Sequence, residues 1–192
     1  MYKIENIIIK NSYLDDKSIY YHKKIYISYL KKLNELLIKN NYDFRYSKKE
    51  LISKIDIFNL NDRDDILYYL GAVLNHELYF NIITNNSNNK YFYDFIKIIE
   101  KRYTSLLNFK LEFKNISNKL VGSGFTFLVI DSNNELNIIN LSNNETPYLY
   151  GYTPLIAMDL WEHSYYLKYN IDKEKYIDDF LNNLNYEYII KK

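Results

Sequence analysis

Residues 159–169 read DLWEHSYYLKY, and this stretch says more about the fold and function than any other part of the chain. Asp159 and His163 are four residues apart, so their side chains can be directed at one metal ion. Glu162, beside that histidine, points in another direction and is available for a different task. The chain has only three His and one Trp, and this stretch holds one of those histidines and the tryptophan. Such a concentration of scarce residue types predicts a functional site.

The composition favours a folded protein without disulfide bonds. Hydrophobic residues make up 47% of the 192 residues, enough for a packed core. The absence of Cys excludes disulfides, thiolate ligands and thiol nucleophiles. A net charge of +1 gives no support for nucleic acid or an anionic membrane as a partner. The first apolar run, Ile7 to Ile9, is too short for a signal peptide and no later run could span a bilayer, so we expect a cytoplasmic protein.

The first part of the chain has helical periodicity. Apolar and aromatic residues recur every three or four positions from Ile19 to Leu33, and again from Ile66 to Leu78. Asp15 and Asp16 are candidate N-caps for the first run. The polar residues 61–65 precede the second run, so the pattern predicts two long helices that form an α-hairpin.

The second part predicts a mixture of helices and strands. The polar run 84–90 is the clearest break, so we expect an N-terminal α-hairpin domain over residues 1–86 and a C-terminal α+β domain over residues 87–192. Within the second domain the pattern predicts helices over 91–113 and 173–184, and strands over 120–130, 135–141 and 155–158. The predicted fold class is α+β with a three-stranded antiparallel sheet.

The three histidines and one aspartate form a candidate metal-binding set. His22 lies on the first predicted helix and His76 on the second, whereas Asp159 and His163 follow the third predicted strand. Three neutral imidazoles and one carboxylate suit a first-row metal such as iron, manganese or zinc. Such a set also leaves a coordination position open for a small substrate.

Four motifs together resemble the iron/manganese superoxide dismutase family. Residues 159–166 resemble the family's D-x-W-E-H-x-Y-Y signature, and Asn75-His76 resembles the start of its N-H-x-x-[FY]-[WF] motif. Residues 122–127, GSGFTF, are similar to its G-S-G-W-x-W strand, and residues 143–147, NNETP, to its N-Q-D-x-P turn. A helical half followed by an α+β half is also the family's order.

The resemblance implies a homodimeric enzyme that binds one manganese or iron ion per subunit and acts on superoxide. The ligands that it implies are His76, Asp159 and His163, and His22 is the candidate for the first ligand position. Glu162 would reach across the dimer interface to His163 of the partner subunit and fix that imidazole. Tyr29 and Tyr166 would line the substrate funnel, and the wall of the site would be formed by Trp161, Phe125 and Phe127.

The first ligand position can be aligned with the family in two ways. Alignment backwards from Tyr29 places Tyr21 there, which implies a phenolate ligand or a lost metal. Alignment forwards from Asp16 places His22 there, with one residue deleted further along. His22, Tyr26 and Tyr29 occupy positions i, i+4 and i+7 of one helical stripe, which favours His22.

Residues around the site depart from the family pattern. Tyr26 or Ile25 replaces the family's gateway His. The active-site Gln is absent, because Ala72 stands at its iron-type position and Asn144 at its manganese-type position. The amide of Asn144 favours the manganese arrangement, although its side chain is one methylene shorter than Gln.

Two functions are therefore compatible with the sequence. The first is a superoxide dismutase that cycles manganese or iron and forms dioxygen and hydrogen peroxide. The second is a catalytically inactive family member that serves as a structural or interaction subunit. Retention of the signature residues favours the first function, and a zinc hydrolase is disfavoured because no H-E-x-x-H motif is present.

Overall fold

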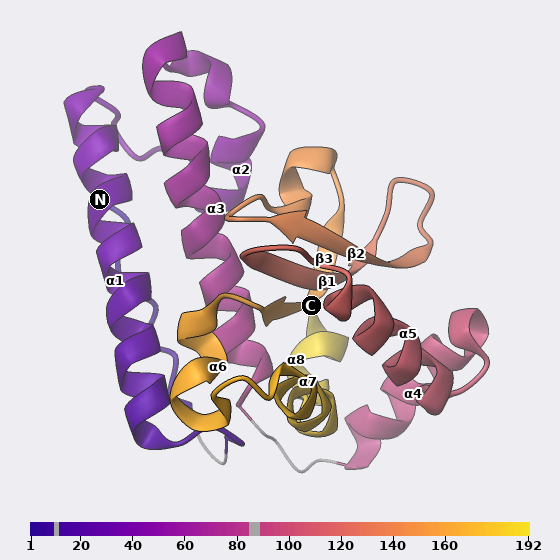
Figure 1. Ribbon diagram of the computed structural model, residues 1–192. Coiled ribbons are helices and arrows are strands. Elements are labelled where there is room, and N and C mark those ends of the chain that lie inside the picture. The colour runs from indigo at the N-terminus through magenta and orange to yellow at the C-terminus, as the bar shows by residue number, and fades with distance from the viewer. Residues whose placement is uncertain (10–11, 85–88) are drawn as a thin grey trace.

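The computed structural model describes residues 1–9, 12–84 and 89–192. Its helices are α1 (Asp16–Lys39), α2 (Lys48–Ile52), the 3₁₀ helix η1 (Ile55–Ile57), α3 (Leu60–Ile82), α4 (Asn89–Tyr103), α5 (Leu106–Asn118), the 3₁₀ helix η2 (Pro147–Tyr150), α6 (Glu162–Tyr169), α7 (Lys173–Asn182) and α8 (Tyr186–Lys191). Its strands are β1 (Gly124–Ile130), β2 (Leu136–Ser142) and β3 (Thr153–Asp159). In Figure 1, α1 and α3 form a long hairpin on one side, and the sheet with α4, α5 and α7 lies on the other.

This arrangement confirms the predicted α+β class with a three-stranded antiparallel sheet. The predicted domain boundary between residues 86 and 87 lies outside the described residues and stays a prediction. None of the described helices is long and apolar enough to cross a membrane.

Helix α1 begins at its predicted cap and buries one continuous stripe. The Asp15 carboxylate accepts a hydrogen bond from the Ser18 backbone N–H at 2.8 Å, which satisfies a donor that the first helical turn leaves free. The buried residues follow at three- and four-residue steps: Ser18, His22, Tyr26, Leu30, Leu33 and Leu37. This stripe packs against α3. A candidate ligand, His22, therefore lies on the face that points into the molecule.

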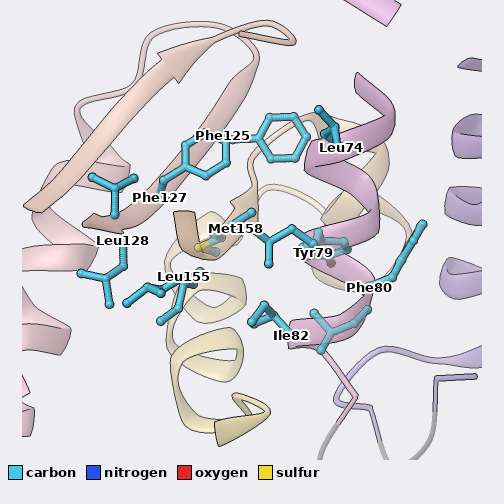
Figure 2. Packing of buried hydrophobic residues seen from close by; sticks show 14 of the residues in the cluster. Leu74, Tyr79, Phe80, Ile82, Phe125, Phe127, Leu128, Leu155 and Met158 are labelled. Atoms are coloured by element: carbon cyan, nitrogen blue, oxygen red, sulfur yellow. The ribbon is translucent and has the colours of Figure 1, made fainter. Parts of the chain in front are cut away.

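Helix α3 is buried around most of its circumference between Leu70 and Phe80. It packs against α1 and also against β3, so it lies between the hairpin partner and the sheet. Figure 2 shows the apolar layer where side chains of α3, among them Leu74 and Tyr79, meet side chains of the sheet such as Phe125 and Met158. His76 packs its ring against Phe80 at 6.1 Å and Phe125 at 5.7 Å, two side chains of this layer, and is completely buried.

The sheet has the order β2-β1-β3, with antiparallel pairing throughout. The central strand β1 is buried on both faces up to Val129, as its continuous apolar sequence predicts. In its register with β3, Phe125 lies opposite Asp159. The last residue of β3 is thereby placed beside the aromatic wall provided by β1.

Two of the helices predicted from the sequence have different bounds in the structure. The predicted helix over 91–113 is interrupted at Thr104, which has a φ of 64°, and Ser105 then caps α5 by accepting from the Asn108 backbone N–H at 3.1 Å. The predicted closing helix ends at Asn182, and Asn185 caps the additional helix α8. In both places a short polar side chain supplies a new N-cap and divides the helical pattern.

Candidate metal centre

One candidate ligand comes from each of four elements, α1, α3, β3 and α6. These ligands are His22, His76, Asp159 and His163, and their ligand atoms all lie within 4.8 Å of one another. The Asp159 Oδ2 atom is 3.0 Å from His22 Nε2, 3.6 Å from His76 Nε2 and 3.4 Å from His163 Nε2. The structure thus brings together residues that are separated by up to 141 positions in the sequence, counted from 22 to 163.

Hydrogen bonds to the other atoms of Asp159 hold its carboxylate in place. Oδ1 accepts from the Trp161 backbone N–H at 2.8 Å, which leaves Oδ2 facing the imidazoles. The carbonyl of Asp159 accepts from the Ser164 hydroxyl at 2.9 Å and from the Tyr176 hydroxyl at 2.7 Å. The carboxylate is fully buried, and the hydrogen bond to Oδ1 together with those to the backbone carbonyl holds residue 159 in place.

The tautomer of His76 is set by its own helix. Its Nδ1 donates to the Ala72 carbonyl at 2.7 Å, so the lone pair is on Nε2, the atom that faces Asp159. Within the described ranges, His76 Nε2 and His163 Nε2 are buried and have no hydrogen-bond partner. Buried polar atoms are nearly always partnered, and a metal ion bound to these nitrogens would satisfy both. The residues present therefore fit a metal ion.

The electrostatics give His22, His76 and Asp159 the protonation states that metal ligands need. Burial lowers the pKa of His22, and lowers that of His76 to about 3, so both imidazoles are neutral. Burial alone would raise the pKa of Asp159, but His163 and His22 together hold it well below its usual range. Three neutral nitrogens and one carboxylate oxygen are a suitable donor set for iron, manganese or zinc.

The structure places His22, and not Tyr21, in this cluster. His22 is 1% exposed, whereas Tyr21 is 46% exposed and packs its ring against Tyr20 at 5.3 Å. The two residues are neighbours on a helix, so their side chains leave the axis about 100° apart. Only one of them can belong to the buried stripe of α1.

Tyr29 and Asn144 lie beside the cluster. The half-buried ring of Tyr29 is 5.5 Å from that of His76, and burial raises the pKa of its hydroxyl to about 12. The side-chain amide of Asn144 is close enough to the Tyr29 hydroxyl to oppose part of this rise in the pKa of Tyr29. Asn144 is only 2% exposed, and neither polar atom of its side chain has a hydrogen-bond partner among the described residues.

Aromatic side chains wall the cluster on two sides. Phe125 lies 5.7 Å from the ring of His76, and Trp161 stacks on His163 at 5.7 Å with an interplanar angle of 28°. Phe127 is one layer further away and stacks on Phe125 at 5.8 Å. The Trp161 indole also donates to the Asn143 carbonyl at 3.3 Å.

Glu162 and Tyr166 lie on the surface of α6. Glu162 is exposed and Tyr166 is 53% exposed. They flank His163, whose side chain is 20% exposed and so reaches the surface from the cluster. Glu162 and Tyr166 therefore face outward beside His163, the most exposed of the four candidate ligands.

Tyr26 is buried but belongs to a different polar group, which the sequence did not reveal. Its hydroxyl donates to Glu77 at 2.8 Å, and Glu77 also pairs with Lys48. Burial raises the pKa of Glu77 to about 7. Ile25, the other residue that could replace a gateway histidine, is half-buried. No periodicity or motif links positions 26, 48 and 77, so the sequence carried no signal for this group.

The fold and the site define a protein that holds a three-histidine, one-aspartate cluster between an α-hairpin and an antiparallel sheet. Residues 75–192, more than half of the chain, match the family described as iron/manganese superoxide dismutases, C-terminal domain. The chain belongs to the iron/manganese superoxide dismutase family.

Proposed function

We propose that this protein is an active superoxide dismutase that uses manganese or iron. The proposed ligands are His22, His76, Asp159 and His163. The observation that carries the proposal is the convergence of these four side chains, with the Nε2 atoms of His76 and His163 buried and without a hydrogen-bond partner among the described residues, in a chain of this family. Bound manganese or iron would supply one-electron chemistry, in which one superoxide is oxidised to dioxygen and a second is reduced to hydrogen peroxide.

The side chains around the cluster have separate tasks in this proposal. Asp159 contributes the negative charge, and the Ala72 carbonyl holds the His76 ring in the required tautomer. The Tyr29 hydroxyl carries its proton at neutral pH, as an ordinary tyrosine does, and burial raises its pKa further, to about 12. Its hydroxyl is therefore able to donate one of the two protons that peroxide formation consumes. Trp161 and Phe125 restrict the access of water.

We further propose that Asn144 acts as the amide that hydrogen-bonds solvent at the site. Its buried, unpartnered amide beside Tyr29 supports this role. Ala72, on α3, cannot supply such a group. The amide is thus contributed from the turn that follows β2, which is the manganese arrangement, and manganese is the metal that we favour.

The proposed assembly is a homodimer. Glu162 would accept a hydrogen bond from His163 of the partner subunit, and Tyr166 would line the funnel through which superoxide enters. Both side chains are exposed beside His163, which supports this arrangement. A carboxylate in that position would fix the imidazole's orientation.

A catalytically inactive structural subunit is the second candidate. The observation that favours it is the position of Tyr26, whose hydroxyl is bound by Glu77 and so is diverted from the cluster. The short side chain of Asn144, one methylene shorter than Gln, also favours an inactive subunit. The complete ligand set argues for the active enzyme.

Elemental analysis and a dismutase assay on the purified chain, supplied with manganese or with iron, test the proposal. We expect close to one ion per chain and dismutase activity, and we expect His163→Ala to lose both. A wild-type dimer that contains no metal and has no activity would favour the inactive subunit. Unchanged dismutation by His163→Ala would contradict the assignment of the site.

A further inference from the structure

The turn formed by Asn143, Asn144 and Glu145, here called the amide turn, is held at three consecutive carbonyl groups. The carbonyl of Asn143 accepts from the Trp161 indole at 3.3 Å. The carbonyl of Glu145 accepts from the Asn75 side-chain amide at 2.9 Å. Between them, the carbonyl of Asn144 lies against the backbone of α3 at Gly71.

The contact at Gly71 is possible only because this residue has no side chain. A Cβ atom at position 71 would lie 2.1 Å from the Asn144 carbonyl oxygen and 3.3 Å from its carbonyl carbon. Glycine inside a helix costs about 1 kcal/mol relative to alanine. Its presence in the interior of α3 therefore indicates a specific reason, and the close approach of the amide turn provides one.

Two hydrogen bonds, here called clamps, hold the amide turn: one is donated by Asn75 and one by Trp161. Both donors belong to segments that carry candidate ligands. Asn75 precedes His76, and Trp161 lies between Asp159 and His163. The turn is therefore held in a fixed position relative to three of the four ligands. What it presents at that position is the amide of Asn144, which is buried and has no hydrogen-bond partner in the described part of the chain.

We infer that Gly71 is a positioning residue that compensates for the short side chain of Asn144. Without a Cβ at position 71, the amide turn sits closer to α3, and the Asn amide reaches the place that a longer Gln would reach from a more distant turn. A Cβ at position 71 would have to be 3.4 Å rather than 2.1 Å from the Asn144 carbonyl oxygen to make an ordinary contact, so the turn would move by about 1.3 Å, slightly less than one carbon–carbon bond of about 1.5 Å. That is close to the reach that one methylene adds. The inference rests on the proposed function.

The test compares Gly71→Ala, Asn144→Gln and the double variant as full-length, manganese-loaded proteins. Two properties are measured, the midpoint reduction potential of the metal and the dissociation constant of azide from its visible absorption. Displacement of the amide in Gly71→Ala should shift the potential and change the azide dissociation constant about two- to tenfold, as expected for one hydrogen bond. In the double variant the longer side chain should restore both values toward those of the wild type.

A stability control separates positioning from general damage. Phe95→Leu truncates a buried ring on α4 and should lower the melting temperature while leaving the potential and azide affinity unchanged. If Gly71→Ala does not fold, Asn75→Ala removes one clamp without adding atoms and should produce the same shift in both properties.

Two results would overturn the inference. One is a stable Gly71→Ala protein with wild-type potential and azide affinity. The other is a double variant that is no closer to the wild type than Gly71→Ala. Both measurements need bound manganese but no turnover, so a metal-loaded wild type without dismutase activity would contradict the proposed function and leave this test intact.

Discussion

At the scale of single residues, the proposed metal site depends most on His22. This imidazole is 3.0 Å from the Asp159 carboxylate, whereas the neighbouring Tyr21 is on the outer surface of α1. We predict that His22→Ala reduces the metal content of the purified protein by at least tenfold, because one of four donors is lost. Tyr21→Ala should retain metal at the wild-type level. Elemental analysis of both variants decides between the two alignments, and metal loss only in Tyr21→Ala would contradict the structure.

The candidate ligands could be predicted from the sequence because their residue types are rare and their spacing is distinctive. Asp159 and His163 are only four residues apart, so one helical turn brings their side chains together. The buried stripe of α1 favours His22 over Tyr21. The roles of Gly71 and Glu77 could not be predicted in this way. Both depend on contacts between segments that are 29 to 73 positions apart, from Lys48 to Glu77 and from Gly71 to Asn144.

At the scale of elements, the N-cap of α1 should make the stability of the protein depend on pH. The Ser18 N–H and hydroxyl bind the Asp15 carboxylate and lower its pKa. A group with a depressed folded pKa stabilises the protein above its unfolded pKa, and this contribution is lost as the pH falls through the folded value. We predict that Asp15→Ala costs about 1 kcal/mol at pH 7, and that the difference from wild type shrinks below the usual carboxyl pKa of 3.8.

Urea unfolding at several pH values measures this contribution. Asp15→Asn is the control, because an amide can cap the helix without a titrating charge. A difference between wild type and Asp15→Ala that stays constant down to the lowest pH at which the protein folds would contradict the charged cap.

The α1–α3 contact offers a second prediction at this scale. Leu37 is completely buried and Ile38, the next residue, is 51% exposed. Leu37→Ala should therefore lower the free energy of unfolding by about 2–5 kcal/mol, and Ile38→Ala by no more than about 0.5 kcal/mol. Urea denaturation of the two variants makes the comparison within one helix. Equal losses would mean that the face of α1 is assigned incorrectly.

The sequence predicted the existence and type of the long elements but not every boundary. Periodicity over 16–39 is strong because α1 buries one stripe for several turns, and α3 is a long apolar helix that is buried around most of its circumference. The break at Thr104 and the cap at Ser105 leave no such signal, since the apolar spacing continues into α5. Local hydrogen bonding by a short polar side chain decided the boundary there.

At the scale of the whole molecule, we predict a dimer that depends on Glu162. Glu162→Ala should increase the fraction of monomer in sedimentation velocity experiments at micromolar concentration, because the proposed contact with His163 of the partner subunit is lost. Glu145→Ala, a change of an exposed acid outside α6, is the control and should sediment as the wild type. A wild-type protein that is monomeric at every concentration would refute the proposed assembly.

The central claim is that His22, His76, Asp159 and His163 together bind one redox-active metal ion. Anomalous diffraction from crystals of protein supplied with both manganese and iron, recorded on either side of each absorption edge, tests it most directly. We predict a single strong peak that lies within bonding distance of Asp159 Oδ2 and of the Nε2 atoms of the three histidines, with the stronger signal at the manganese edge. A site with no anomalous peak at either edge, or a peak that excludes any of the four residues, would refute the proposed metal site.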